Sequence, residues 1–90
     1  MNIVIYGAGA IGSHLAYCLR DKSNNIAIIT KKKYLKKFKE KGINVKIFSN
    51  ENFKKEVFVK ENEKIHFYSN INNLSKNFTK RIDAIFITVK

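Results

Sequence analysis

The amino-acid sequence predicts an α/β fold with a doubly wound, mostly parallel β-sheet, of which these 90 residues form a part. The first observation is a short apolar run rich in β-branched residues, NIVIY at 2–6, which ends at a glycine and is typical of a buried strand. The second is a change to helical spacing of the apolar residues directly afterwards. The third is another apolar run, IAIIT at 26–30. A strand, a helix and a strand within about thirty residues have the spacing of a right-handed parallel βαβ unit.

The first helix is expected to begin near Ala10 and to end at the polar, turn-forming segment DKSNN at 21–25. Four apolar residues fall at positions i, i+4, i+7 and i+8 of one helical face: Ile11, Leu15, Cys18 and Leu19. This face is predicted to pack against the strands. Cys18 would then be a buried, unreactive thiol.

A second helix is predicted in KKKYLKKFKEKG at 31–42, with Gly42 in the position of a left-handed C-terminal cap. Its narrow apolar stripe consists of Tyr34, Leu35 and Phe38. A single helical turn is also indicated within 70–78.

The middle of the chain has a different pattern. INVKIF at 43–48 alternates apolar and polar residues, which predicts a strand with one wet face. Further short strands are indicated at 56–59 and 64–68, with polar links between them. We therefore expect a short antiparallel excursion within residues 43–68.

The last segment, IDAIFITVK at 82–90, is almost entirely apolar after its aspartate and is typical of a central strand covered on both faces. Strand 2–6 is expected to lie between the parallel strands 26–30 and 82–89. One side of the last strand should then be unpaired. An unpaired apolar edge favours self-association.

The chain is strongly basic. Eighteen Lys and Arg residues against seven Asp and Glu residues give a formal net charge of +11. This charge concentrates anions near the chain, so nucleic acids, phosphorylated cofactors and acidic membranes are all electrostatically compatible partners. Compositional drift toward Lys, Asn and Ile explains the charge equally well.

Nothing in the sequence indicates a membrane protein or an exported one. No apolar stretch approaches the ~20 residues that span a membrane, and no signal peptide is recognised. The single cysteine forms no internal disulfide, which is consistent with a cytoplasmic location.

Gly7, Gly9 and Gly12 form a G-x-G-x-x-G motif between the first strand and the first helix, a context typical of a dinucleotide-binding (Rossmann) fold. The first glycine permits the tight turn, the second lets a pyrophosphate approach the backbone, and the third lets the helix pack close to the strands. Unpaired N–H groups at the helix N-terminus would bind the pyrophosphate. The alternative is a glycine-rich turn that only permits close packing. The candidate cofactor-binding segment is Gly7, Ala8, Gly9, Ala10, Ile11 and Gly12.

The end of the second strand distinguishes the two nicotinamide dinucleotides. A NAD-binding unit places a carboxylate there, about 20 residues after the glycines, to hold the ribose 2′-hydroxyl. This chain has Thr30 followed by Lys31, Lys32 and Lys33. A 2′-phosphate attracts an ammonium group, so the segment favours NADP, with Lys31 as the main contact and Thr30 as a further hydroxyl contact. The alternative is that the lysines form a solvated first helical turn, where they would oppose the helix dipole.

Three segments together resemble ketopantoate reductases (2-dehydropantoate 2-reductases): MNIVIYGAGAIGSHLAYCL at 1–19, ITKKKYLKKFKEKGINV at 29–45 and IDAIFITVK at 82–90. The resemblance extends over the whole chain. It implies a Rossmann domain that binds NADPH, in enzymes that reduce ketopantoate to pantoate for pantothenate and coenzyme A synthesis. It also implies that the glycine segment holds the pyrophosphate, that Lys31 holds the 2′-phosphate, and that Lys90 lies at the cofactor's edge of the site.

In this family the nucleotide domain is longer and a helical domain follows it. The resemblance assigns the catalytic lysine and the substrate-binding residues to those later parts. Residues 1–90 are therefore expected to be the N-terminal part of a dinucleotide-binding domain, with the catalytic helical domain absent. No catalytic residue and no metal ligand is predicted, and a small 2-oxo acid substrate is expected only for a longer parent protein.

Two alternatives stay open. A small basic nucleic-acid-binding module would use the positive charge together with aromatic residues interleaved with lysines. Against it, arginine is limited to Arg20 and Arg81, and no helix-turn-helix, zinc-finger or RNA-recognition motif is recognised. The other alternative is a nucleotide-binding fragment without chemistry.

Overall fold

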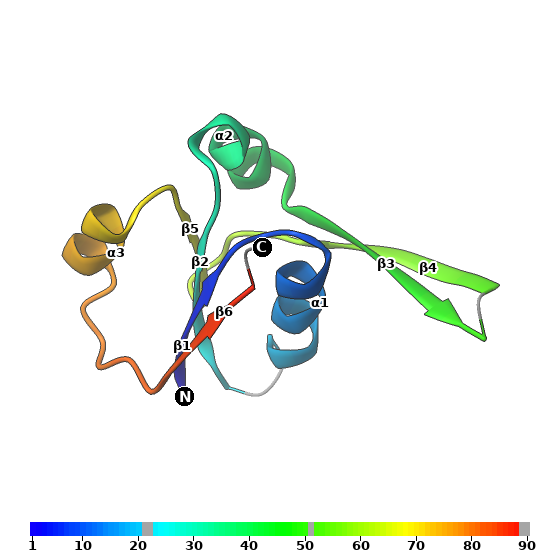
Figure 1. The fold of residues 1–90 in the computed structure, drawn as a ribbon, viewed down its shortest axis with the longest axis horizontal. Helices are drawn as coiled ribbons and strands as arrows, with labels where there is room; N and C mark the ends of the chain where they lie inside the picture. The colour runs from blue at the N-terminus through cyan, green and yellow to red at the C-terminus, as the bar shows by residue number, and fades with distance from the viewer. Residues whose placement is uncertain (21–22, 51, 89–90) are drawn as a thin grey trace.

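The computed structural model describes residues 1–20, 23–50 and 52–88 (Figure 1). In chain order its elements are β1 (Asn2–Tyr6), α1 (Ala10–Leu19), β2 (Asn25–Ile29), α2 (Lys32–Lys41), β3 (Ile43–Ser49), β4 (Asn52–Val59), β5 (Ile65–Tyr68), α3 (Ile71–Asn77) and β6 (Ala84–Ile87). The first two strands and the first two helices begin within one residue of the predicted positions.

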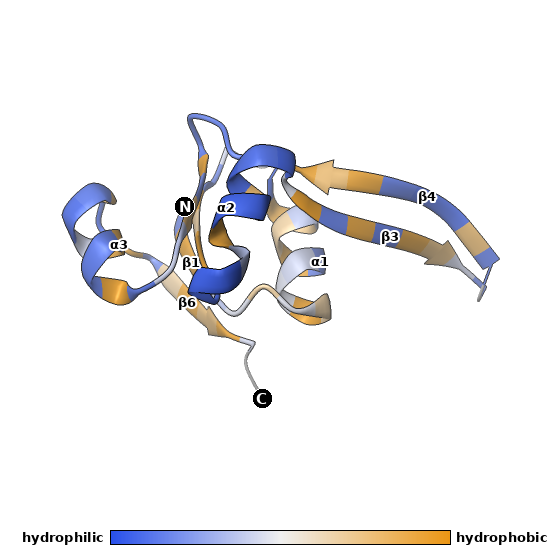
Figure 2. Cartoon of the chain, turned by 90° about the horizontal axis from the view of Figure 1, so that it is seen from above, coloured by the Kyte–Doolittle hydropathy of each residue, from blue (hydrophilic) through white to orange (hydrophobic). Residues whose placement is uncertain are grey.

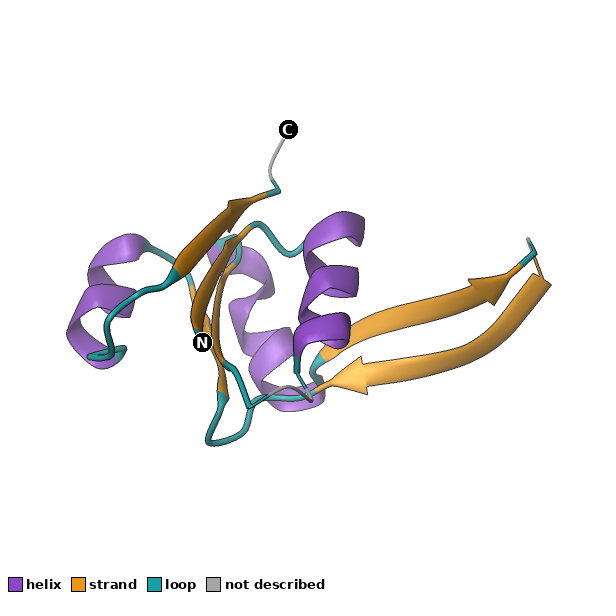
Figure 3. Ribbon diagram, turned by 90° about the horizontal axis from the view of Figure 1, so that it is seen from below, coloured by secondary structure: helices purple, strands orange, loops and turns teal. Residues whose placement is uncertain are grey.

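The main sheet is parallel and has the strand order β5-β2-β1-β6. β1 lies between β2 and β6, as predicted, with Ile3 aligned to Ile26 on one side and to Ala84 on the other. Helices α1 and α2 cover one face of the sheet and α3 covers the other (Figure 3). This is the doubly wound α/β arrangement that the sequence predicts.

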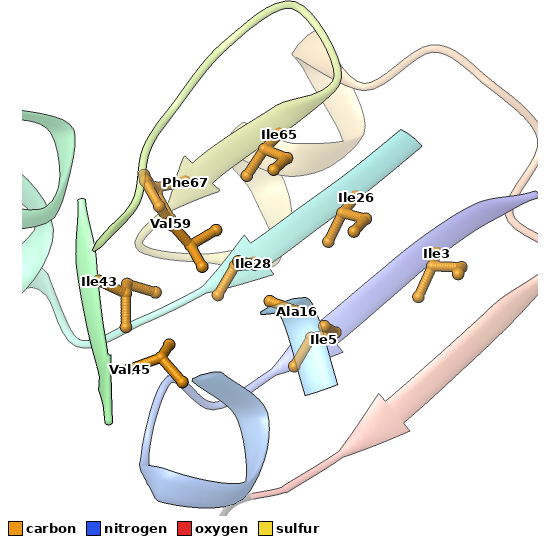
Figure 4. Packing of buried hydrophobic residues seen from close by; sticks show 10 residues of the cluster. All are labelled: Ile3, Ile5, Ala16, Ile26, Ile28, Ile43, Val45, Val59, Ile65 and Phe67. Atoms are coloured by element: carbon orange, nitrogen blue, oxygen red, sulfur yellow. The ribbon is translucent and has the colours of Figure 1, made fainter. Parts of the chain in front are cut away.

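The larger part of the core lies between the sheet, α1, α2 and the first residues of β3 (Figure 4). Ile5 of β1 and Ile28 of β2 are fully buried there. Val4 and Ala27 alternate with them and pack on the opposite face with Leu74 of α3. Because side chains of successive strand residues point to opposite faces, a strand covered on both sides is apolar throughout.

The face through which α1 packs overlaps only in part with the predicted one, because Leu15 and Leu19 pack on the main core as expected. Gly12, Ser13 and Ala16 are its buried residues, whereas Ile11 is 73% exposed and Cys18 is exposed. The expectation of a buried Cys18 is therefore wrong. Small side chains on the inner face let α1 lie close to the sheet, and a search for large apolar residues at helical spacing passes over them.

β3 and β4 form a separate antiparallel pair, with Ile43 opposite Val59 and Ser49 opposite Asn52. The base of this hairpin packs on α1, and its far end projects away from the other elements (Figures 1 and 3). Hydrophobic and hydrophilic residues alternate over 43–47 of β3, where exposed residues also alternate with more buried ones, whereas β4 has a hydrophilic stretch followed by a hydrophobic one (Figure 2). The wet face predicted for this segment is therefore present.

The antiparallel excursion predicted within 43–68 is shorter in the structure, because it ends with β4 at Val59. The segment 64–68 contains β5, which pairs in parallel with β2 as a strand of the main sheet. Ile65 and Phe67 anchor it in the main core, where both are buried. The sequence of a four-residue strand does not indicate whether it pairs in parallel or antiparallel. The pairing of β5 with β2 is therefore determined by the tertiary structure and could not be predicted from the local sequence.

The two edges of the main sheet differ. At the outer edge of β5, the backbone N–H groups of Ile65 and Phe67 donate to Asn62 Oδ1 and Glu61 Oε2, at 2.9 and 3.0 Å. The N–H of Asn62 in turn donates to the Ile65 carbonyl at 2.9 Å. Side chains and a turn from the preceding loop therefore occupy the positions that an added strand would use.

β6 forms the opposite edge of the sheet, so its outer side is unpaired, as predicted. The prediction that both faces of this strand are covered is wrong. Its apolar side chains are exposed, at 59%, 39% and 74% for Ile85, Phe86 and Ile87. An apolar run alone does not distinguish a central strand from an uncovered edge.

Candidate functional site

The glycine segment lies at the carboxyl end of β1, where the chain turns into α1 (Figure 1). Gly7 has a φ of 115°, a conformation that residues with a side chain rarely adopt, so the tight turn depends on glycine. Its N–H donates to the Ile29 carbonyl of β2 at 2.9 Å. The loop is thus held against the sheet at its first residue.

Gly12 and Gly9 differ in the space around them. A Cβ on Gly12 would collide with the Gly7 carbonyl and would lie 2.7 Å from Thr88 Oγ1. The absence of a side chain at Gly12 therefore lets α1 approach the loop and the end of β6 closely. A Cβ on Gly9 would meet no atom within 4 Å, so the space beside this residue is open to an incoming group.

Two hydroxyl groups hold the carbonyls of the loop. Ser13 Oγ donates to the Ala8 carbonyl at 2.9 Å, and Thr88 Oγ1 donates to the Gly7 carbonyl at 2.8 Å. The loop is thereby fixed from α1 on one side and from the end of β6 on the other. Neither hydroxyl was identified from the sequence, because a lone Ser or Thr has no pattern that reveals its acceptor.

The N-terminus of α1 receives no side-chain cap from its N-cap residue. Gly9 is the N-cap residue and supplies no side-chain hydrogen bond, and the first turn contains no acidic residue. Ala10 and Ile11 of this turn are exposed. The N–H groups of the first turn and the positive end of the helix dipole favour an anion at this position.

The second predicted contact region lies at the carboxyl end of β2. The glycine loop follows the carboxyl end of the neighbouring parallel strand β1, so the two regions lie at the same end of the strands. Thr30 is 6% exposed, and its N–H donates to the Tyr68 carbonyl at 2.8 Å. Lys31 is the exposed N-cap residue of α2 and forms no ion pair with any described residue. Lys33 has a different environment, because its Nζ lies 5.0 Å from the centroid of the Tyr34 ring. Lys90, the remaining predicted contact, lies outside the described residues.

A groove of about 480 Å³ adjoins the start of α1. The glycine loop contributes Ala8, Gly9 and Ala10 to one side, and β3 contributes Asn44, Lys46 and Phe48 to the other. Among the described lining residues there is no carboxylate, and Lys46 is the one with a permanent charge. The β3 residues were not identified from the sequence, because only the folding of the hairpin brings them beside the glycines.

A larger groove of about 760 Å³ runs between α2, β5 and α3. Its lining includes Lys39 and Glu61, whose Nζ and Oε2 lie 3.6 Å apart, and the half-buried His66 predicted to be a strand residue. Tyr68 also lines it, and burial, with a smaller contribution from the Glu61 carboxylate, raises the pKa of the Tyr68 phenol. None of the described glycine-loop residues lines this groove, so it is separate from the predicted site.

Within residues 1–20, 23–50 and 52–88, no group of His, Cys, Asp and Glu side chains is arranged to hold a metal ion. His14 is exposed on α1, and its ring centroid lies 6.2 Å from that of Tyr17. In the same described part of the chain, no helix has the length and apolar character needed to cross a membrane.

Comparison with protein families gives one relevant match. The family described as ketopantoate reductase PanE/ApbA matches residues 3–90, which is nearly the whole chain. Searches of curated proteins and of solved structures gave no significant match. The matched region includes the glycine loop, the carboxyl end of β2, and strand β6. These features belong to the three segments in which the sequence resembles this family. The chain therefore belongs to the ketopantoate reductase PanE/ApbA family.

Proposed function

We propose that this chain binds NADPH and is the NADP(H)-binding portion of a ketopantoate reductase-like oxidoreductase. The observation that carries the proposal is that two features lie at the carboxyl ends of the neighbouring strands β1 and β2. One is the N-terminus of α1, which has no side-chain cap from its N-cap residue and lies next to open space at Gly9. The other is the exposed Lys31. The first feature suits a pyrophosphate and the second suits a 2′-phosphate.

The preference for NADPH over NADH rests on the end of β2. A carboxylate there would accept hydrogen bonds from a ribose 2′-hydroxyl, but this chain has Thr30 and then three lysines. Lys31 has no competing ion pair among the described residues, so its ammonium group is available to a 2′-phosphate. Thr30 would add a hydroxyl next to that contact.

When bound, NADPH supplies the hydride that reduces a carbonyl group. The residues of this chain bind and orient the dinucleotide: Gly7 and Gly12 shape the loop, and Ser13 and Thr88 hold its carbonyls. We assign no proton donor among the described residues. For a longer parent protein, the family favours a 2-oxo acid such as ketopantoate as substrate, and the free thiol of Cys18 is in keeping with a cytoplasmic location.

The substitution Lys31→Glu tests the proposal by removing the attraction to a 2′-phosphate and adding a repulsion. A charge-assisted contact to phosphate is worth roughly 1.5–3 kcal/mol, or about ten- to a hundredfold in affinity. NADPH affinity should therefore fall by at least about tenfold, whereas NADH affinity should be kept or improved, because the new carboxylate can accept from the ribose 2′-hydroxyl. Isothermal titration calorimetry with both cofactors measures the two changes.

Lys33→Glu is the matched control, because it makes the same change of charge two residues away, at a lysine that lies over Tyr34. It should lower the affinities for NADPH and NADH only slightly. If Lys31→Glu and Lys33→Glu lower both affinities equally, the lysines act only through general charge, and the preference for NADP is wrong.

A further inference from the structure

The hairpin of β3 and β4 forms part of the wall of the groove beside the glycine loop, although no motif in its sequence indicates a ligand. Lys46 of β3 lines this groove together with Gly9 and Ala10, at the start of α1. We infer that Lys46 is a second cationic ligand of the dinucleotide and that it acts on the diphosphate. This inference rests on the proposed function, because it names a further residue of the same site.

Lys46 has no ion-pair partner among the described residues. In the antiparallel register, Lys46 lies directly opposite Glu56, which would be its natural counter-ion. In the structure, Glu56 Oε1 accepts a hydrogen bond of 2.7 Å from Asn44 Nδ2, and no ion pair joins Glu56 to Lys46. No described carboxylate lies within ion-pair distance of Lys46, so its charge is left for a group outside the described part of the chain.

The charged features that line the groove are positive. The described lining contains Lys46 and no Asp or Glu, and one end of the groove is the positive end of the α1 dipole. Two positive features that line the same groove repel each other unless an anion lies between them. An extended anion with a phosphate near Gly9 and Ala10 satisfies both, and the diphosphate is the part of a dinucleotide that binds at such a helix start.

Lys46 and Lys31 therefore have separable roles. Lys31 follows β2 and is assigned to the 2′-phosphate, which NADPH has and NADH lacks. Lys46 comes from the hairpin and faces the diphosphate, which both cofactors share. Loss of Lys46 should lower the affinities for NADPH and NADH by the same factor, whereas loss of Lys31 should change the ratio of the two affinities.

The experiment compares two small probes in the full chain. ADP has a diphosphate and no 2′-phosphate, and adenosine 2′-monophosphate has the reverse. Lys46→Gln should lower the affinity for ADP by about five- to tenfold and should change the affinity for adenosine 2′-monophosphate by no more than about twofold. NMR titration measures both affinities. NADPH and NADH should both lose about five- to tenfold. Lys46→Arg, which keeps the charge, should restore most of the affinity.

Lys54→Gln is the control for general charge, because Lys54 is exposed on β4 and does not line the groove. It should change none of these affinities by more than about twofold. If Lys46→Gln has no larger effect than Lys54→Gln, or if it weakens NADPH but not ADP and NADH, the inference is overturned while the proposed function stands. If the unmodified chain binds neither cofactor, the proposed function fails and the inference fails with it.

Discussion

Single residues of the glycine loop have different tasks, although the motif makes them look equivalent. Gly7 provides a backbone conformation, with its φ of 115°. Gly12 provides a close approach, because any Cβ there would collide with the Gly7 carbonyl. Gly9 provides neither, since a Cβ at this residue meets no atom within 4 Å among the described residues other than its chain neighbours. In the folded chain, Gly9 is thus the glycine that the fold itself does not require, which is in keeping with a task in ligand binding.

This difference predicts opposite results for two alanine substitutions. Gly12→Ala should lower the free energy of unfolding by roughly 1–3 kcal/mol, because the backbone must move to accommodate the new atom. Gly9→Ala should leave the free energy of unfolding within about 0.5 kcal/mol and should weaken NADPH by at least about tenfold. Urea unfolding and NADPH titration measure the two quantities. A Gly9→Ala chain that binds NADPH normally would show that no ligand approaches the backbone there.

The residues of the site show how far the sequence could predict it. The three glycines and the end of β2 could be identified, because each belongs to a local pattern in which spacing defines the geometry. Ser13 and Thr88, which hold the carbonyls of the loop, and Lys46, which lines the adjacent groove, could not be identified. Thr88 reaches the Gly7 carbonyl across 81 positions of sequence, and no local pattern encodes such a contact.

At the scale of the elements, the sheet has one protected edge and one open edge. Glu61 and Asn62 accept hydrogen bonds from the outer edge of β5, whereas β6 presents an unpaired edge with exposed apolar side chains. The net charge of +11 opposes the approach of two chains, and salt weakens this repulsion. Association through β6 is therefore expected to increase with salt.

We predict that the chain associates with itself through β6 and that Ile87→Lys suppresses the association. Ile87 is 74% exposed on this edge strand, so a lysine there places repelling charges in the contact without loss of core packing. Sedimentation velocity at rising protein concentration measures the mass of the associated species. The salt concentration is 0.5 M, a roughly threefold higher ionic strength than physiological.

Ile71→Lys is the control for this prediction, because Ile71 is 59% exposed on α3, away from the open edge. It should leave the association of the chain unchanged. A monomeric unmodified chain at high concentration, or equal suppression by both substitutions, would contradict a role for the β6 edge.

At the scale of the whole molecule, the sequence predicted the fold class and the central order β2-β1-β6, because strand, glycine loop and helix follow one another in a topology of fixed handedness. It did not predict the position of β5 or the exposure of β6. Both depend on which elements are adjacent in space. Part of the inner face of α1 was also missed: Leu15 and Leu19 pack on the core as predicted, but the most buried residues of the helix are small and no apolar pattern identifies them.

We propose that this strongly basic chain binds a phosphorylated dinucleotide at the glycine loop. The most direct test is an equilibrium titration of the unmodified chain with NADPH, with NADH and with random-sequence duplex DNA, each at several salt concentrations. We expect saturable binding of one NADPH per chain, at least about tenfold tighter than the binding of NADH at low salt, with the difference decreasing as salt rises. Saturable binding of neither cofactor, together with DNA binding whose affinity falls steeply with salt, would contradict it and favour a nucleic-acid-binding module.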